Sequence, residues 1–252
     1  MKPKFLYNNL LTAATLSASG TYTGYTVQNI LDEKPFTYWM AAAAGSNWIK
    51  GQFGSAQLVN CIGIVGHNLH TVGATVYVEY SSDGTNWSTA ASNVPADDLA
   101  FMISFAFETT YAYWRLRIEN TSGIPMIAVL FMGAEIEFEW PADTPHAILD
   151  EGINAIEELS KGGNMLGASV NFNDHALDRS FSNFTRTWFD IYFLPFWNVC
   201  GKLKKNFFYA DDITNAPAQI YFCRFKNDFR LQPNVVMSTY INTMTISVVA
   251  VR

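Results

Sequence analysis

The hydrophobic and polar positions of the first 139 residues alternate in the way that is typical of β-strands. In "TVYVEYSSDGTNW" (75–87) apolar and polar side chains alternate, and "SDG" then supplies a turn in which Gly84 can take a positive φ. The segment "AYWRLRIEN" (112–120) alternates again, with an outward face of Arg115, Arg117 and Glu119. No amphipathic helix of ten or more residues is expected here, so the spacing predicts a β-sandwich.

The second part of the chain has a different pattern of apolar and polar residues. "WPADTPHA" (140–147) holds two prolines and no periodicity, and we interpret it as a linker between domains at 1–139 and 148–252. "AIEELSKGGNMLGASVNF" predicts a hairpin with Gly162-Gly163-Asn164 at its tip, and "STYINTMTISVVAVR" predicts a long final strand. The one expected helix is "NFTRTWFDIYFLPFWN" (183–198), with a cap at Asn183 or Thr185 and an interruption at Pro195. We therefore expect a mainly β chain with one helix.

Composition narrows the possible functions. The net charge of −6 argues against nucleic acid as a partner, and no apolar run of 18 residues is present to span a membrane. The first 20 residues resemble a signal peptide, but Tyr7, Asn8 and Asn9 break the apolar stretch, so we expect them to belong to the mature fold. The three cysteines are too few for a disulfide framework and indicate free thiols in a reducing compartment.

Catalytic signatures are not found in the sequence. The serine-hydrolase, zinc-protease and nucleotide-binding motifs are missing, so we expect that the protein is not an enzyme. Paired acids at 97–98, 157–158 and 211–212 are neighbours in sequence, and neighbours on a strand point to opposite faces. A glycan-processing enzyme remains an alternative, since the sequence does not give the separation of two carboxylates across a cleft.

Four segments of residues 1–139 together resemble the discoidin, or coagulation factor 5/8 type C, family of galactose-binding-like jelly rolls. "VYVEYSSDGTNW" carries the most specific part of the resemblance, a hairpin with the pattern S-x-D-G-x-x-W. "NWIKGQFGSAQLVNCIGIVGHN" and "YAYWRLRIEN" are similar to other strands of the family, and "TYTGYTVQNILDEKPFTYW" to its acidic turn, with matching positions at Asn29, Asp32, Thr37 and Trp39. The resemblance implies a jelly-roll sandwich that meets ligands with the loops at one end.

The resemblance also implies a possible structural calcium. In glycan-binding relatives the acidic turn and a late glutamate hold the ion, which here implies Asp32, Thr37 and Glu135 as side-chain ligands. Two positions depart from the family pattern, because Glu33 replaces a glycine and Lys34 replaces the second acid. The alternative is that Asp32 and Thr37 satisfy backbone groups of a tight turn. No other cofactor is expected.

Aromatic rings stack on sugars, and amide or imidazole groups bond hydroxyls, so the resemblance suggests a set of glycan contacts. The candidates are Tyr22, Tyr25, Trp48, His67, Asn68 and His70. The alternative for each is packing, and we expect Trp39 and Trp87 in the core. His67 and His70 could also bind zinc, although no third ligand lies near them in sequence.

Residues 145–252 are similar in the order of their elements to a small domain in tail proteins of tailed bacteriophages. This implies a virion protein at the distal end of a tail, folded in the host cytoplasm, that forms a ring through its C-terminal domain. Its partners would be other copies, other tail proteins and a host cell-surface glycan, unless the outward domain only braces its neighbours. A glycan-binding module of a bacterial adhesin or carbohydrate-active complex is the alternative. The candidate assembly residues are Trp188, Phe193, Phe196 and Trp197, unless they pack on their own sheet.

Overall fold

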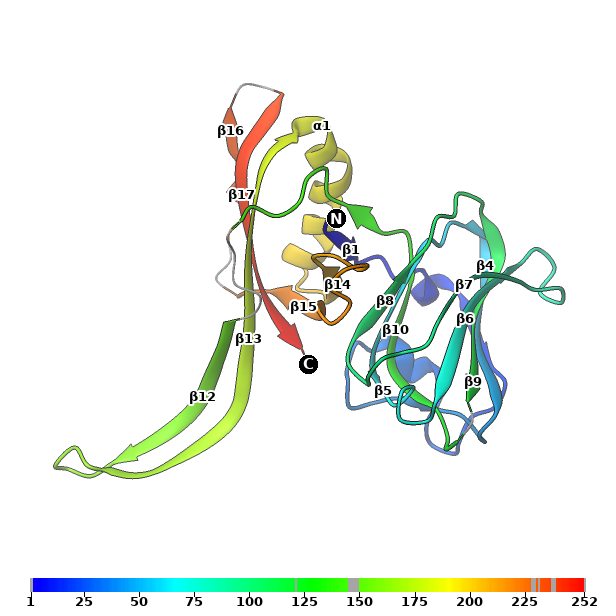
Figure 1. The fold of residues 1–252 in the computed structure, drawn as a ribbon, viewed down its shortest axis with the longest axis horizontal. Coiled ribbons are helices and arrows are strands. Elements are labelled where there is room, and N and C mark those ends of the chain that lie inside the picture. The colour runs from blue at the N-terminus through cyan, green and yellow to red at the C-terminus, as the bar shows by residue number, and fades with distance from the viewer. Residues whose placement is uncertain are drawn as a thin grey trace. The chain divides into compact units, whose positions relative to one another are not determined.

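The computed structural model describes residues 2–120, 122–144, 150–227, 230, 232–236 and 239–251. The chain is mainly β, which confirms the predicted fold class (Figure 1). It divides into two compact units. Unit 1 comprises Met1–Phe138 and Asn206–Phe222, and unit 2 comprises Glu139–Lys205 and Cys223–Arg252.

Unit 1 contains a five-stranded and a four-stranded antiparallel sheet. The first sheet has the order β2 (Thr15–Ala18), β4 (Ser46–Gln57), β9 (Tyr111–Asn120), β6 (Ala74–Ser81), β7 (Ser88–Asn93). The second has the order β3 (Trp39–Met40), β10 (Met126–Gly133), β5 (Cys61–His67), β8 (Phe101–Ser104). Two 3₁₀ turns, η1 (Leu10–Ala13) and η2 (Val27–Leu31), connect the early strands.

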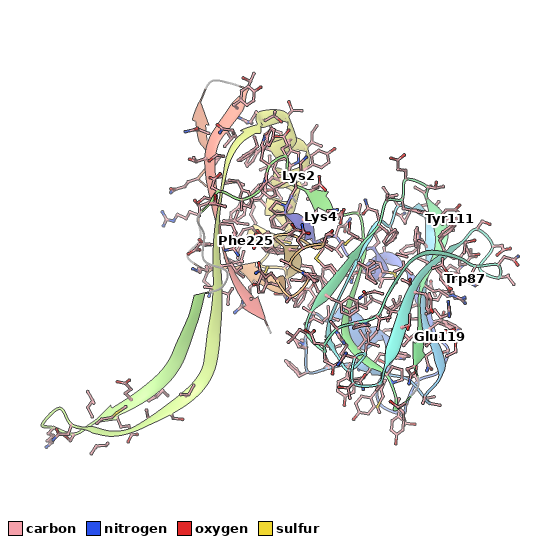
Figure 2. All side chains as sticks on the ribbon, viewed as in Figure 1. Lys2, Lys4, Trp87, Tyr111, Glu119 and Phe225 are labelled. Atoms are coloured by element: carbon pink, nitrogen blue, oxygen red, sulfur yellow. The ribbon has the colours of Figure 1, made fainter. Side chains whose placement is uncertain are left out.

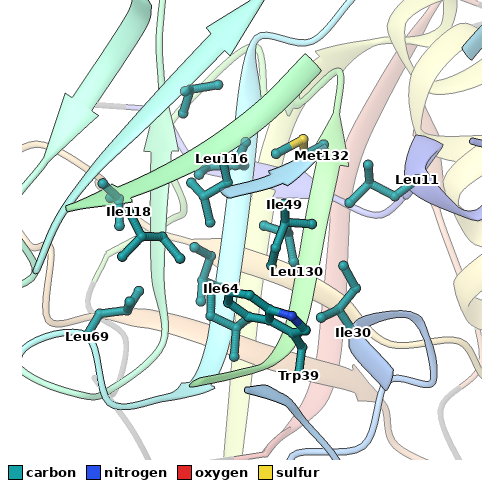
Figure 3. Close-up of a cluster of buried hydrophobic side chains, with 14 of the residues drawn as sticks. Leu11, Ile30, Trp39, Ile49, Ile64, Leu69, Leu116, Ile118, Leu130 and Met132 are labelled. Carbon is teal, nitrogen blue, oxygen red and sulfur yellow. The ribbon is translucent and has the colours of Figure 1, made fainter. Parts of the chain in front are cut away.

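The core of unit 1 is formed by the inward side chains of both sheets, as Figure 3 shows. Leu116 and Ile118 of β9 are fully buried, as their alternation with charged residues predicts. Ile64 of β5 and Leu130 of β10 belong to the same cluster. Each buried aliphatic side chain of this size stabilises the fold by roughly 1.5–3 kcal/mol. The outward residues of β9 are thereby fixed on the other face of the five-stranded sheet.

Residues distant in sequence complete unit 1. β1 (Lys4–Leu6) pairs with β11 (Ile136–Glu137) and with β14 (Phe207–Ala210). The ring of Phe208 lies so close to Gly63 that a Cβ at Gly63 would be 2.6 Å from it. The sequence-based division assigns 206–222 to the second domain, whereas in the structure they belong to unit 1. That the two halves have separate functions stays a prediction.

Unit 2 is built on strand β13 (Met165–Thr185), which pairs with β12 (Asp150–Leu159) and β17 (Tyr240–Val251). β16 (Asn234–Val236) pairs with β17, and β15 (Ile220–Phe225) begins in unit 1 and ends in unit 2. The predicted hairpin tip is confirmed, because the Ser160 N–H donates to the Asn164 carbonyl and Gly163 has a φ of +80°. β12 and the first half of β13 run away from the rest of unit 2 as a two-stranded ribbon (Figure 1).

The predicted helix is present, but its form differs from the expectation. It runs through α1 (Arg186–Trp188), η3 (Phe189–Phe193), α2 (Leu194–Phe196) and η4 (Trp197–Gly201), and η3 and η4 are π-helical. The Thr185 hydroxyl accepts from the Trp188 N–H, so the predicted cap at Thr185 is confirmed. The predicted interruption at Pro195 is wrong, because the proline lies in the first turn of α2 and the helical turns continue past it to Gly201.

Candidate functional site

Four loop segments of unit 1 are joined by hydrogen bonds at one end of the sandwich. They are residues 19–26, 40–46, 68–73 and 122–125. The bonds run from Tyr22 N–H to the Met40 carbonyl (2.9 Å), from Ala41 N–H to the Pro125 carbonyl (3.0 Å) and from Ser122 N–H to the Val72 carbonyl (3.3 Å). This network holds the loops in fixed positions, so side chains that project from them are preorganised.

Three tyrosines, which we call the tyrosine cluster, lie beside these loops: Tyr22, Tyr25 and Tyr38. The rings of Tyr25 and Tyr38 stack with centroids 4.8 Å apart, and Tyr22 lies 6.1 Å from Tyr25 at a tilt of 58°. A hydrogen bond with Tyr25 raises the pKa of the Tyr38 phenol. Tyr22 is 49% exposed at the outer side of the cluster. The cluster therefore presents one open aromatic ring that two stacked rings support.

The local backbone explains the position of Tyr22. The Tyr25 N–H donates to the Tyr22 carbonyl in a tight turn, and Gly24 within it has a φ of +90°, which favours glycine. The Met40 N–H then donates to the Tyr25 carbonyl, which ties the turn to β3. The sequence predicted Tyr22 and Tyr25 but missed Tyr38. The signal for Tyr38 was its place next to the buried Trp39, since neighbours on a strand face opposite sides.

The acidic turn contains two of the three predicted calcium ligands. The Thr37 hydroxyl donates to Asp32 Oδ2 (2.5 Å), and the Lys34 N–H donates to Asp32 Oδ1 (3.0 Å). Glu33 has a φ of +60°, the conformation that the family's glycine adopts easily, and its carboxylate accepts two bonds from Asn206. Asp32 and Thr37 thus satisfy groups of a tight turn, as the alternative interpretation expected.

Glu135, the third predicted calcium ligand, forms an ion pair with Lys4 and accepts a hydrogen bond from Ser104 (2.9 Å). Although burial opposes the charge of Lys4, its hydrogen bond to Glu135 contributes to a raised pKa. Within the described parts of the chain, no three His, Cys, Asp or Glu side chains come close enough to hold a metal ion. Calcium also takes hydroxyl and backbone carbonyl oxygens, so the calcium site stays a prediction.

His67 and Asn68 hold the loops together. Both ring nitrogens of His67 are occupied, because Nδ1 accepts from the Leu69 N–H (3.2 Å) and Nε2 lies 2.7 Å from the Leu99 carbonyl. Burial lowers the pKa of His67, so the ring is neutral. The Asn68 side chain donates to the Ile124 carbonyl and accepts from the Met126 N–H. These bonds replace the sugar contacts that the sequence analysis predicted for both residues.

His70 and Trp48 lie outside the tyrosine cluster. His70 is exposed, and its Nδ1 is 3.0 Å from the Pro95 carbonyl. With His67 Nε2 beside the Leu99 carbonyl, the pair offers no zinc site. Trp48 is half-buried on the outer face of β4, directly opposite Arg117. Of the six predicted glycan contacts, the structure brings only Tyr22 and Tyr25 together in one cluster.

The predicted assembly residues in unit 2 are mostly internal. Trp188, Phe193 and Phe196 are buried, and Trp197 packs on Phe225 with ring centroids 5.1 Å apart. The structure corrects the assembly prediction for the three buried rings, which pack within their own unit. The large apolar side chains that are exposed on the helix are Ile191, Tyr192, Leu194 and Val199. The 3.6-residue period of an α-helix does not predict which side chains are exposed here. A π-helical turn holds more residues, so it changes which of the following side chains face outward.

Comparison with known proteins agrees with the first-half resemblance. Residues 13–130 match the family described as F5/8 type C domain. No curated protein matches the chain. One similar solved structure is chitosan-binding module 1 of a chitosanase/glucanase from Paenibacillus sp. IK-5, with 23% identity and a TM-score of 0.44, covering 51% of this chain and 100% of that one.

Two further solved structures are similar. CpGH89CBM32-5 from Clostridium perfringens, in complex with GalNAc-β-1,3-galactose, has 16% identity and a TM-score of 0.44, and covers 50% of this chain and 100% of that one. A pectin-binding carbohydrate-binding module has 24% identity and a TM-score of 0.42, and the match covers 51% of this chain and 92% of that one. The F5/8 type C resemblance of residues 13–130 is thus confirmed, and the tail-protein resemblance of residues 145–252 stays a prediction. None of the described helices combines the length and the apolar character that crossing a membrane requires.

Proposed function

We propose that unit 1 is a non-catalytic carbohydrate-binding domain that holds a glycan against the tyrosine cluster. The observation that carries the proposal is the open ring of Tyr22, supported by the stacked rings of Tyr25 and Tyr38 at the loop end of the sandwich. The match of residues 13–130 to the F5/8 type C domain supports it, since glycan-binding relatives belong to that family.

The chemistry around the cluster suits a sugar. An aromatic face packs against the C–H groups of a pyranose ring, and hydroxyls need polar partners at its edge. Thr21, Thr23 and Gln28 are exposed polar side chains on the same short stretch of chain as Tyr22. Because the Tyr25–Tyr38 stack and the turn at Gly24 already fix the platform, little side-chain freedom is lost when a sugar binds.

A substitution of Tyr22 tests this function. The full chain is screened on an array of neutral and acidic glycans, and the affinity for the best neutral glycan is then measured by calorimetry. We expect Tyr22→Ala to weaken binding by about tenfold, because stacking on one aromatic ring contributes on the order of 1 kcal/mol or more. Tyr192→Ala is the matched control, since Tyr192 is also 49% exposed but belongs to unit 2. No neutral glycan bound, or equal effects of the two variants, would contradict the proposal.

A second function, self-assembly through unit 2, is favoured by the β12–β13 ribbon. Five large apolar side chains project from it into solvent, and they are Ile156, Leu159, Met165, Leu166 and Val170. A two-stranded ribbon has little stability of its own in water, and an apolar strand edge is prone to pair with another chain. Burial of the ribbon against a second copy would cover this surface.

We propose on this basis the more specific role of a structural component at the distal end of a bacteriophage tail. The C-terminal half would form a ring with other copies and contact other tail proteins, while the N-terminal domain binds a host cell-surface glycan. In this proposal the protein folds in the host cytoplasm and resides in the virion. The alternative, a glycan-binding module of a bacterial adhesin or carbohydrate-active complex, shares the glycan site but needs no ring.

Oligomeric state separates these two roles. We expect sedimentation of the full chain to show a closed oligomer, and Leu166→Glu to convert it to smaller species, because the charge would be buried at the contact. Leu203→Glu is the matched control, since Leu203 is 67% exposed and Leu166 is 68% exposed in the same unit. A wild-type monomer at micromolar concentration would favour the binding module.

A further inference from the structure

The outer face of the five-stranded sheet in unit 1 gathers positive charge. Lys50, Arg115 and Arg117 lie there and are half of the lysines and arginines before residue 139. In the register of the sheet, Lys50 is directly opposite Arg115, so two like charges face each other across β4 and β9. Like charges directly opposite each other destabilise a sheet. We call these three side chains the cationic face.

One buried carboxylate fixes the two arginines. Glu79 of β6 has a side chain that is 6% exposed and accepts from Nε of Arg115 (2.5 Å) and Nε of Arg117 (2.8 Å). The second carboxylate nearby, Glu119, pairs with a terminal nitrogen of Arg117. Within the described residues, Arg115 uses only its Nε in hydrogen bonds, which leaves its terminal N–H groups available for a ligand. The guanidinium groups are therefore held in place before anything binds.

Each of the two arginines stacks on an aromatic ring. The Arg115 guanidinium carbon lies 4.1 Å from the Trp87 ring centre, and that of Arg117 lies 3.9 Å from the Tyr77 ring centre. Trp87 is half-buried under Arg115, so the expectation that it belongs to the core is wrong. Trp87 and Glu119 lie on the side of the sandwich near β6 (Figure 2). These stacks orient the charges and cover the ring faces.

Lys50 is the cation with the fewest partners. Its ammonium lies 5.4 Å from the Trp48 ring centre, and it forms no ion pair with any described residue. Adjacent strands are about 4.8 Å apart and alternate residues of a strand are about 6.8 Å apart, so the three charges form a patch about 10 Å across. Three cations against Glu79 and Glu119 leave a net positive surface on a chain whose net charge is −6.

We propose that the cationic face binds an acidic polysaccharide, one that carries carboxylates or sulfates, at a site separate from the tyrosine cluster. Arg115 and Arg117 donate to the anionic groups through their outward N–H groups, and Lys50 adds a third charge. A nucleic acid fits this surface poorly. Its bases need open aromatic faces to stack on, and the cations already cover the rings of Trp87 and Tyr77.

The test uses the full chain and three polymers: polygalacturonate, its methyl-esterified neutral form, and dextran sulfate. We expect binding to polygalacturonate or dextran sulfate that weakens steeply with added salt, and little binding to the neutral ester. Lys50→Gln should lower the affinity about three- to tenfold, and it leaves the Glu79–arginine pairs intact. Lys34→Gln is the control, because Lys34 is an exposed lysine of the same unit outside this face.

The outcomes of this test are independent of the neutral-glycan site. Tyr22→Ala should keep its affinity for the acidic polymer, and Lys50→Gln should keep its affinity for the neutral glycan. Binding of neither acidic polymer, binding of the neutral ester as tight as that of both acidic polymers, or equal effects of Lys50→Gln and Lys34→Gln, would overturn the proposal. Salt-sensitive binding of single-stranded DNA with the same dependence on Lys50, but of neither acidic polymer, would overturn the assignment of the ligand.

Discussion

Among the candidate site residues of unit 1, some side chains form hydrogen bonds with neighbouring loops and others face solvent. His67 and Asn68 join the loop at 68–73 to the segments at 99 and 124–126 by hydrogen bonds to their backbone groups. The Tyr22 side chain forms no hydrogen bond with any residue that the structure describes, and its ring is exposed. Sequence names candidate residue types for a sugar site, but an amide or imidazole has the same letter whether it bonds a ligand or a neighbouring loop. The choice between these roles needs the backbone positions.

His67 predicts a pH dependence of stability. Because burial lowers the pKa of His67, the folded state binds this proton less readily than the unfolded chain, where a histidine has a pKa of about 6.5. The stabilisation is complete above about pH 6.5 and is lost as the pH falls below that value. Urea titrations between pH 7.5 and pH 5 should show a decreasing free energy of unfolding. His67→Asn should have a smaller decrease, and His70→Asn, at an exposed site, should behave as the wild type.

A stability that is independent of pH in this range, or an unchanged slope in His67→Asn, would contradict the structural role of His67. The lower limit of pH 5 keeps the titration above the usual range of carboxylates, so Asp98, which lies 3.7 Å from His67 Nδ1, stays charged throughout.

Some features of the strands and helices can be predicted from local sequence patterns, and others cannot. The alternation in 112–120 predicted β9 with the correct inward face, because burial of Leu116 and Ile118 requires it. The sequence predicts a helix over 183–198 with a cap at Asn183 or Thr185, and the structure has it at 186–201 with Thr185 as the cap. The outward face of this helix is not predictable, because no local sequence pattern indicates π-helical turns. The pairing of β1 with β14 was not predictable either, since it joins residues about 200 positions apart.

The packing of β14 on the sandwich gives a prediction for a single glycine. Gly63→Ala should lower the free energy of unfolding by about 1–3 kcal/mol, because the new methyl group would overlap the Phe208 ring. Gly54→Ala is the control, since nothing lies within 4 Å of a Cβ at that position of β4. Thermal and urea unfolding of both variants would measure the difference. Equal stability of the two variants would show that residues 206–222 do not pack on β5.

At the scale of the whole molecule, each of the two units is built from two separate stretches of the chain. The chain leaves unit 1 after Phe138, returns at Asn206 and leaves again after Phe222. A fragment of residues 1–139 would therefore lack β14 and expose Gly63 and Phe131, which packs on Phe208. For this reason the binding and assembly experiments use the full chain. Sequence predicted the mainly β class and the F5/8 type C region, and the contribution of 206–222 to unit 1 is what it could not show.

The proposed function depends most on a glycan contacting the tyrosine cluster, and the resonances of labelled tyrosines measure this contact directly. The full chain is labelled with ¹³C in its tyrosine rings and titrated with the neutral oligosaccharide that binds best on the array. We expect the ring signals of Tyr22, Tyr25 and Tyr38 to shift in a saturable way, while that of Tyr192 does not move. Saturable binding that leaves all three signals unchanged would contradict the proposed function.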